Sequence, residues 1–171
     1  DDIPNTIAGA TRAVARLNVH MFNIHASAGI EAMREAVAYK GKSHVLAVTV
    51  LTSLEENNTH LIFGGPIKAK VLQLARDAMI AGCDGVICSP QELEFLGRQK
   101  ELDGLAKITP GVRPEWAAAG DQKRIMTPAE AFKAGASALV IGRPITNPPP
   151  EIGTPVQAVQ RIIEEIEEVT L

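Results

Sequence analysis

The chain has 171 residues, of which 46% are apolar and 22% charged, so it can bury a substantial core and its length fits one domain. A net charge of −3 leaves no excess of lysine or arginine to cover a nucleic-acid backbone or an anionic membrane, and we expect neither as a partner. No apolar run approaches the roughly 18 residues of a membrane span, and we expect a cytoplasmic protein.

Short apolar runs alternate with amphipathic helical stretches, which is typical of a parallel sheet with crossover helices. The first helix is expected over 7–17, with Pro4 in its first turn and Asn5 or Thr6 as its cap. The polar stretch 55–60 is expected only as a connection to a later helix. Further helices are expected over 29–39, 67–81, 91–98, 127–134 and 156–169, and strands over 21–25, 44–51, 84–88, 106–109 and 138–141.

Local signals mark where two of these helices begin or end. Gly82 is expected to end the helix 67–81, and Gly135 the helix 127–134. Thr127 and Glu130 have the spacing of a capping box at the start of that second helix.

This order of elements predicts an α/β fold of the (β/α)₈ TIM-barrel class, here incomplete. A barrel needs eight strands over about 250 residues, whereas the chain contains roughly five strands and six helices. We therefore expect 1–171 to be a single partial barrel domain that lacks its first three strands, and a missing segment before Asp1. An open sheet of the remaining strands alone would expose apolar edges.

The two cysteines, Cys83 and Cys88, lie in an apolar stretch without a second cysteine or histidine pair at zinc spacing. We interpret both as small buried hydrophobic residues of a reducing compartment. No metal site is expected.

Active sites of such barrels are built from the loops after the strands, and two of these loops suit an anion. Residues 109–113 and 120–124 form a long loop rich in hydrogen-bond donors, including Arg113 and Gln122. The last predicted strand is followed by Gly142 and Arg143, of which the glycine allows close approach of a ligand and the arginine offers a planar fork to phosphate oxygens. Together these loops predict phosphate binding.

The opening residues 1–6, DDIPNT, resemble the end of the signature DxKxxDIPNT of the orotidine 5′-phosphate decarboxylases, most of all the bacterial form. Further matches follow in family order over nearly the whole chain, at 22–27, 47–53, 109–114, 120–128 and 140–146.

The resemblance implies roles for individual residues. Asp2 would be catalytic, as part of a charged Lys-Asp-Lys-Asp network, and would reach the active site of the neighbouring subunit of a homodimer, where Thr6 would contact the ligand. Thr52 and Ser53 would meet the pyrimidine edge. His25 and Ser27 are interpreted as structural. The remaining substrate-binding residues, which would hold the 5′-phosphate, are Pro110, Arg113, Gln122, Gly142 and Arg143.

The family converts orotidine 5′-monophosphate to UMP in pyrimidine biosynthesis without a metal or organic cofactor. The signature's lysine would lie just before Asp1, so we expect the catalytic lysine outside this chain. Lys107 and Lys123 are not placed to replace it. Two alternatives stay open: a sugar-phosphate lyase of the same superfamily, such as a hexulose-phosphate synthase or keto-gulonate-phosphate decarboxylase, and a non-catalytic fragment that binds phosphate ligands.

Overall fold

The computed structural model describes residues 1–117 and 126–170, whose strands form one parallel sheet in the order β1-β2-β3-β4-β5. Each strand pairs with its neighbour in sequence, from Met21 opposite His44 to Pro110 opposite Val140. No helix of the described parts of the chain is long and apolar enough to cross a membrane. The strands are β1 (Met21–His25), β2 (His44–Val48), β3 (Gly85–Ile87), β4 (Ala106–Pro110) and β5 (Ala138–Val140).

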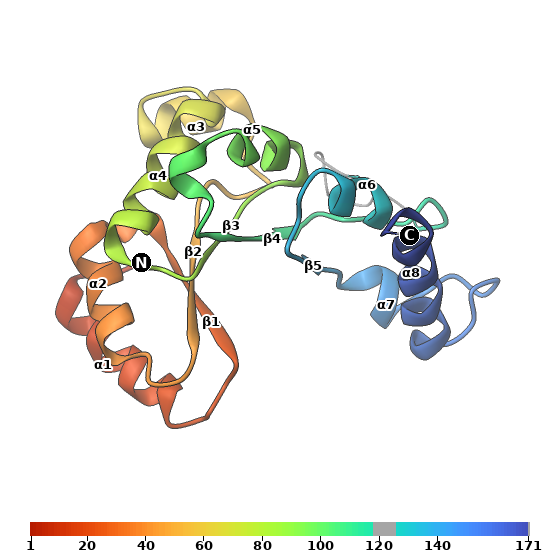
Figure 1. Ribbon diagram of the computed structural model, residues 1–171, viewed down its shortest axis with the longest axis horizontal. Coiled ribbons are helices and arrows are strands. Elements are labelled where there is room, and N and C mark those ends of the chain that lie inside the picture. Colours follow the sequence, from red (N-terminus) through yellow and green to blue (C-terminus); the bar gives the residue numbers. More distant parts are fainter. Residues whose placement is uncertain (118–125, 171) are drawn as a thin grey trace.

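Helices connect and follow these strands. Figure 1 shows the sheet running through an arch, with α1, α2 and α4 beside β1–β3 at one end and α6, α7 and α8 beyond β5 at the other. Short 3₁₀ turns cover 26–28, 90–92 and 100–102. The helices are α1 (Pro4–Ala15), α2 (Ile30–Tyr39), α3 (Glu56–Phe63), α4 (Ile67–Ala81), α5 (Leu93–Gly97), α6 (Pro128–Lys133), α7 (Arg143–Thr146) and α8 (Pro155–Thr170).

All five expected strands are present, but β2 ends at Val48 and not at residue 51. Val48 is the last residue of β2 that pairs on either side, with His25 of β1 and with Ile87 of β3. Both neighbouring strands end there, at His25 and Ile87. The Thr49 N–H still donates to the Ile87 carbonyl at 3.1 Å, but Val50 and Leu51, although apolar, lie beyond the paired residues.

The start of α1 differs from the expectation. Pro4 lies in the first turn as expected, but the residue before it, Ile3, is the N-cap and makes no side-chain cap. Asn5 and Thr6 therefore lie inside the first turn and do not cap the helix, which ends at Ala15 and not at residue 17. Asn18 follows with a φ of 53°, a left-handed conformation that asparagine tolerates better than most residues.

The polar stretch 55–60 was expected as a connection, and this expectation is wrong, because α3 occupies most of it. The buried Thr59 donates its hydroxyl to the Glu55 carbonyl at 3.1 Å, and Glu56 accepts the Ile67 N–H at the start of α4 at 3.2 Å. Gly64, with a φ of 71°, ends the helix. Packing against α4 stabilises α3, which the sequence of this stretch does not predict by itself.

The expected helix ends at Gly82 and Gly135 are confirmed, whereas the helix expected over 91–98 is a 3₁₀ turn at 90–92 followed by α5. Gly82 ends α4 in a left-handed conformation with a φ of 83°, and Gly135 follows α6 with a φ of 100°. At the start of α6, Thr127 accepts the Glu130 N–H at 3.2 Å and Glu130 accepts the Thr127 N–H at 2.9 Å, which is the expected capping box.

The core lies between the sheet and helices α2, α4 and α5. Its largest fully buried side chains include Met33, Leu93, Leu96 and Val71. Cys83 and Cys88 are free and buried, as expected, and burial raises their pKa values to about 11 and about 12.

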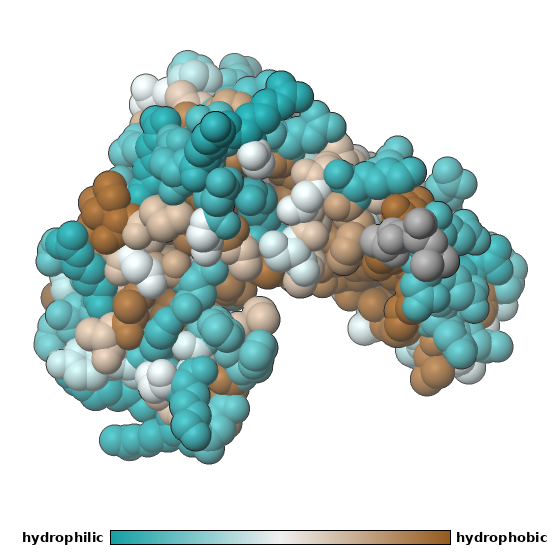
Figure 2. All heavy atoms as spheres, in the orientation of Figure 1, coloured by the Kyte–Doolittle hydropathy of each residue, from teal (hydrophilic) through white to brown (hydrophobic). Residues whose placement is uncertain are grey.

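Strands β1 and β5 are the two edges of the sheet. Each edge exposes apolar side chains: Met21 is 41% exposed and Val140 is 50% exposed. An apolar groove of about 470 Å³ runs along α8, and Figure 2 shows apolar atoms on the inner side of the arch near β4 and β5. The groove is lined by Ile145, Pro155, Val156, Val159, Gln160 and Ile163.

Candidate functional site

The residues that follow the parallel strands all lie at one edge of the sheet, the carboxyl edge, which is where open and closed parallel sheets place their ligands. Thr52 and Ser53 form a turn after β2, Pro110 is the last residue of β4, and Gly142 and Arg143 follow β5. The strand ends thus bring the predicted site residues to the same side of the molecule.

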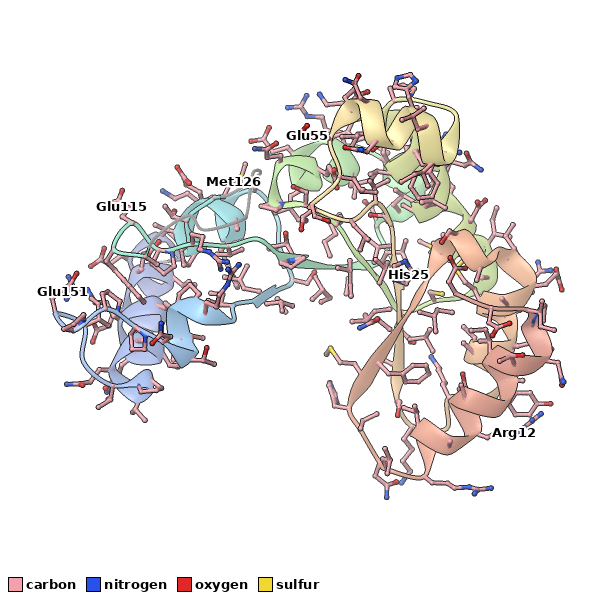
Figure 3. All side chains as sticks on the ribbon, turned by 180° about the vertical axis from the view of Figure 1, so that it is seen from behind. Arg12, His25, Glu55, Glu115, Met126 and Glu151 are labelled. Atoms are coloured by element: carbon pink, nitrogen blue, oxygen red, sulfur yellow. The ribbon has the colours of Figure 1, made fainter. Side chains whose placement is uncertain are left out.

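Arg113 is held by a short pairing beyond the end of β4. Val112 forms an isolated bridge with Met126, and the Arg113 N–H donates to the Met126 carbonyl at 2.9 Å. The side chain is only 8% exposed, and its Nη1 donates to the Val112 carbonyl at 3.2 Å. Figure 3 labels Met126, the bridge partner of Val112, and Glu115, which follows two residues after Arg113. The bridge fixes the backbone from which Arg113 extends.

Arg143 is placed by the short helix α7. The N–H groups of Ile145 and Thr146 donate to the Gly142 carbonyl at 2.9 and 3.0 Å, and Pro144 is buried beneath the turn. A Cβ added at Gly142 would meet no described atom within 4 Å, so space is open at this residue. The Arg143 side chain is exposed.

Arg113 and Arg143 line the same cavity, whose volume is about 570 Å³. Two arginines that come from different strands and lie far apart in sequence thus converge as expected. A pair of guanidinium groups offers several N–H donors to a phosphate group in a geometry that suits its oxygens. The other lining residues are Trp116, Ala117, Pro144, Asn147, Pro148, Pro149 and Pro150.

The other predicted site residues are not among the described residues that line this cavity. Pro110 pairs with Val140 in the sheet, and Gln122 lies outside the described residues. Thr52, Ser53, Asp2 and Thr6 are not among the described residues that line the cavity.

The N-terminal residues lie near the end of β1. Asp2 and Thr6 are exposed, and Asp2 accepts the Ile3 N–H at 2.7 Å. Asp1 accepts a hydrogen bond from the Ser27 hydroxyl at 3.0 Å. Partial burial lowers the pKa of His25. Ser27 therefore contributes a structural contact between α1 and the end of β1.

Sequence analysis missed Trp116, Asn147 and the three prolines 148–150 as residues of the cavity. The signal for Trp116 was its position, three residues after Arg113 in a segment already predicted to bind an anion. The prolines looked like an ordinary connection, because nothing in a run of Asn-Pro-Pro-Pro indicates which cavity it lines.

A second cavity of about 630 Å³ adjoins the first at Trp116, and it is acidic. Five of the nine described residues that line it are glutamates, and Arg161 is the basic residue among them. Within the described residues, no group of three histidine, cysteine, aspartate or glutamate side chains is arranged to hold a metal ion. Because the second cavity is lined by carboxylates, which repel anions, the cavity that contains Arg113 and Arg143 is the candidate anion site.

Residues 1–162 match the model of the "Orotidine 5'-phosphate decarboxylase / HUMPS family". The orotidine 5′-phosphate decarboxylase of Geotalea daltonii is 47% identical over 173 residues, which cover 96% of this chain and 70% of that protein. That of Halorhodospira halophila is 51% identical over 150 residues, which cover 85% of this chain and 63% of that protein.

The crystal structure of orotidine 5′-phosphate decarboxylase from Lactobacillus acidophilus superposes with a TM-score of 0.78 at 33% sequence identity. The match covers 96% of this chain and 71% of that one, so the chain spans about 63 to 71% of the lengths of these three proteins. The parallel sheet with its alternating helices is of the TIM-barrel type that these neighbours share. The chain belongs to the orotidine 5′-phosphate decarboxylase / HUMPS family.

Proposed function

We propose that this chain belongs to an enzyme that decarboxylates orotidine 5′-monophosphate to UMP in pyrimidine biosynthesis. The observation that carries the proposal is the convergence of Arg113 and Arg143, from the loops after β4 and β5, on one cavity at the carboxyl edge of the sheet. Such a site suits the 5′-phosphate of a nucleotide. The relatives at 47% and 51% identity carry the name of this decarboxylase, which favours it over a sugar-phosphate lyase.

The proposed division of labour follows the family resemblance. Arg113, Gln122, Gly142 and Arg143, together with Pro110, hold the phosphate end of the substrate. Thr52 and Ser53 meet the pyrimidine at the same edge of the sheet. Binding energy from the phosphate, which does not react, is then available to hold the pyrimidine in the environment that promotes its reaction.

In the reaction, the bond between carbon 6 of the pyrimidine and its carboxylate breaks. The electron pair stays on carbon 6, CO₂ leaves, and a lysine ammonium stabilises the charge and delivers the proton. We propose that this lysine lies outside the 171 residues. Asp2 belongs to its charged network and, with Thr6, reaches the neighbouring subunit of a homodimer. The exposure of both residues at the start of α1 supports this, and light scattering that shows the active species to be a single chain would exclude it.

We further propose that the five strands are the last five of an eight-stranded barrel. Strands β1 and β5 have free edges in the described sheet, apolar side chains are exposed beside both, and the relatives are longer than this chain. The mass of the protein purified from its source tests this: about 25 kDa would support a full barrel. Decarboxylation by a chain that begins at Asp1 would contradict the proposed position of the lysine. The buried free thiols suit the cytoplasmic location that we propose.

Ligand binding by substituted proteins tests the phosphate site. Arg143→Ala should weaken UMP binding by roughly 2–3 kcal/mol and leave uridine binding nearly unchanged, because only UMP loses a charge-assisted contact. Arg98→Ala is the matched control. Arg98 is an exposed arginine directly after α5 that pairs with Glu94 of that helix, and it is not among the described residues that line the cavity. An equal loss for UMP and uridine would remove the phosphate assignment of Arg143.

A further inference from the structure

Trp116 is the single tryptophan of the chain, and it lies in the cavity of the two arginines. Its backbone belongs to a turn that the Ala117 N–H closes by donating to the Pro114 carbonyl at 2.9 Å. This turn directly follows the bridge between Val112 and Met126 that positions Arg113. The backbones of Trp116 and Arg113 are therefore held by the same short structure, and Trp116 also lines the acidic cavity.

The indole N–H of Trp116 is buried and has no hydrogen-bond partner among the described residues. Buried tryptophan N–H groups normally find an acceptor, because a donor removed from water and left unpaired destabilises the protein. Among the described side chains, the only other buried nitrogen or oxygen without a partner is the Ser89 hydroxyl, which lies after β3 and does not line this cavity. An unpaired donor in the wall of a proposed ligand site requires an explanation.

The chemistry of the cavity indicates which acceptor the indole would meet. Among the described residues that line it, the charged ones are Arg113 and Arg143, both donors, and Asn147 carries the one side-chain oxygen that can accept a hydrogen bond. A phosphate held by the two guanidinium groups has more oxygen lone pairs than they can satisfy. The ligand would thus supply the acceptor that the indole N–H lacks in the protein.

We propose that Trp116 is a further phosphate-binding residue, whose indole N–H donates to an oxygen of the phosphate held by Arg113 and Arg143. This inference rests on the proposed function, because it needs the anion in this cavity. The N–H is inaccessible to water in this structure, so the indole ring must turn when the phosphate binds. The hydrogen bond to the phosphate forms only after the ring has turned. Bound ligand therefore favours the turned orientation of the ring.

The first test uses the unsubstituted protein. With ¹⁵N-labelled tryptophan the chain has a single indole N–H signal, which reports on Trp116 alone. Titration with UMP should move this signal downfield and slow its exchange with solvent, as a new bond to a charged oxygen requires. Inorganic phosphate should produce the same shift, and uridine should not. A signal that stays in place while calorimetry records saturation with UMP would overturn the role of Trp116.

The second test separates this inference from the proposed function by measuring UMP and uridine binding to three variants. Trp116→Phe keeps an aromatic wall and removes the donor, so it should weaken UMP binding about 10-fold and leave uridine binding unchanged. Arg143→Ala should weaken UMP binding more, and Arg98→Ala should have no effect. If Arg143→Ala weakens UMP binding but Trp116→Phe does not, Trp116 has no such role and the proposed function stands. If neither does, both proposals fail.

Discussion

Asp84 is the centre of an ion cluster at the amino edge of the sheet, opposite the candidate site, and its replacement by asparagine should destabilise the fold. Its carboxylate accepts Lys40 Nζ at 2.7 and 2.6 Å on its two oxygens and the Val45 N–H at 2.8 Å, and His44 Nδ1 lies 3.3 Å away. These contacts join the end of α2 to the starts of β2 and β3. Asparagine has nearly the same shape as aspartate but lacks the negative charge that attracts Lys40 and the other donors.

The magnitude follows from the partial burial of the pair. The side chains of Lys40 and Asp84 are 23% and 27% exposed, so the pair lies between a surface and a buried ion pair. Surface pairs contribute roughly 0.2–1 kcal/mol, whereas breaking a buried pair costs roughly 3–5 kcal/mol. We expect Asp84→Asn to lower the free energy of unfolding by about 2 kcal/mol. That corresponds to a fall in the melting temperature of about 4–8 °C for a chain of this length.

The effect should depend on pH in a defined direction. Burial opposes ionisation of Asp84, but hydrogen bonds from Lys40, the Val45 N–H and His44, with the charge of Lys40, outweigh it and lower the pKa of the carboxyl. A carboxyl whose pKa is lower in the folded state binds fewer protons there than in the unfolded chain. Its contribution is therefore complete above the unfolded-state value of about 4. It is lost as the pH falls further.

Urea denaturation of both proteins at pH 7 and at pH 3 measures the effect. The difference in stability should be present at pH 7 and reduced at pH 3, where the carboxyl of the unfolded chain is mostly protonated. Asp103→Asn is the matched control, because Asp103 is an exposed aspartate after a 3₁₀ turn, and it should change stability by less than about 0.5 kcal/mol. Equal stabilities of wild type and Asp84→Asn at pH 7, or a difference that does not shrink at pH 3, would refute the reasoning.

Two further predictions concern the core. Burial raises the pKa values of Cys83 and Cys88 to about 11 and about 12. Neither thiol should therefore react with an aromatic disulfide reagent at pH 8 until urea unfolds the chain. Rapid reaction of the native protein would contradict their burial. Gly85→Ala would place a Cβ 2.6 Å from the Ala106 carbonyl oxygen between β3 and β4, so denaturation should record a loss of about 1–3 kcal/mol. Gly97→Ala, with open space around it, should lose nothing, and equal effects would exclude the close contact as the cause.

The amino-acid sequence by itself determined the alternation of strands and helices and several of their boundaries, because these depend on neighbouring residues. The apolar runs of the strands, the capping box of Thr127 and Glu130 and the glycine at position 82 act within a few positions of the elements that they define. The family signature at 1–6 and the ordered matches after it likewise need no coordinates, and the family model confirms the family that they indicate.

Tertiary structure alone decided what depends on residues far apart in the chain. α3 is stabilised by its packing on α4, and β2 ends where both of its neighbours end. That Arg113 and Arg143 line one cavity follows from the pairing of β4 with β5 and from the bridge at Val112, which bring together residues thirty positions apart. The unpaired N–H of Trp116 is the clearest case, because whether a donor has a partner is a property of the folded surroundings and not of the residue.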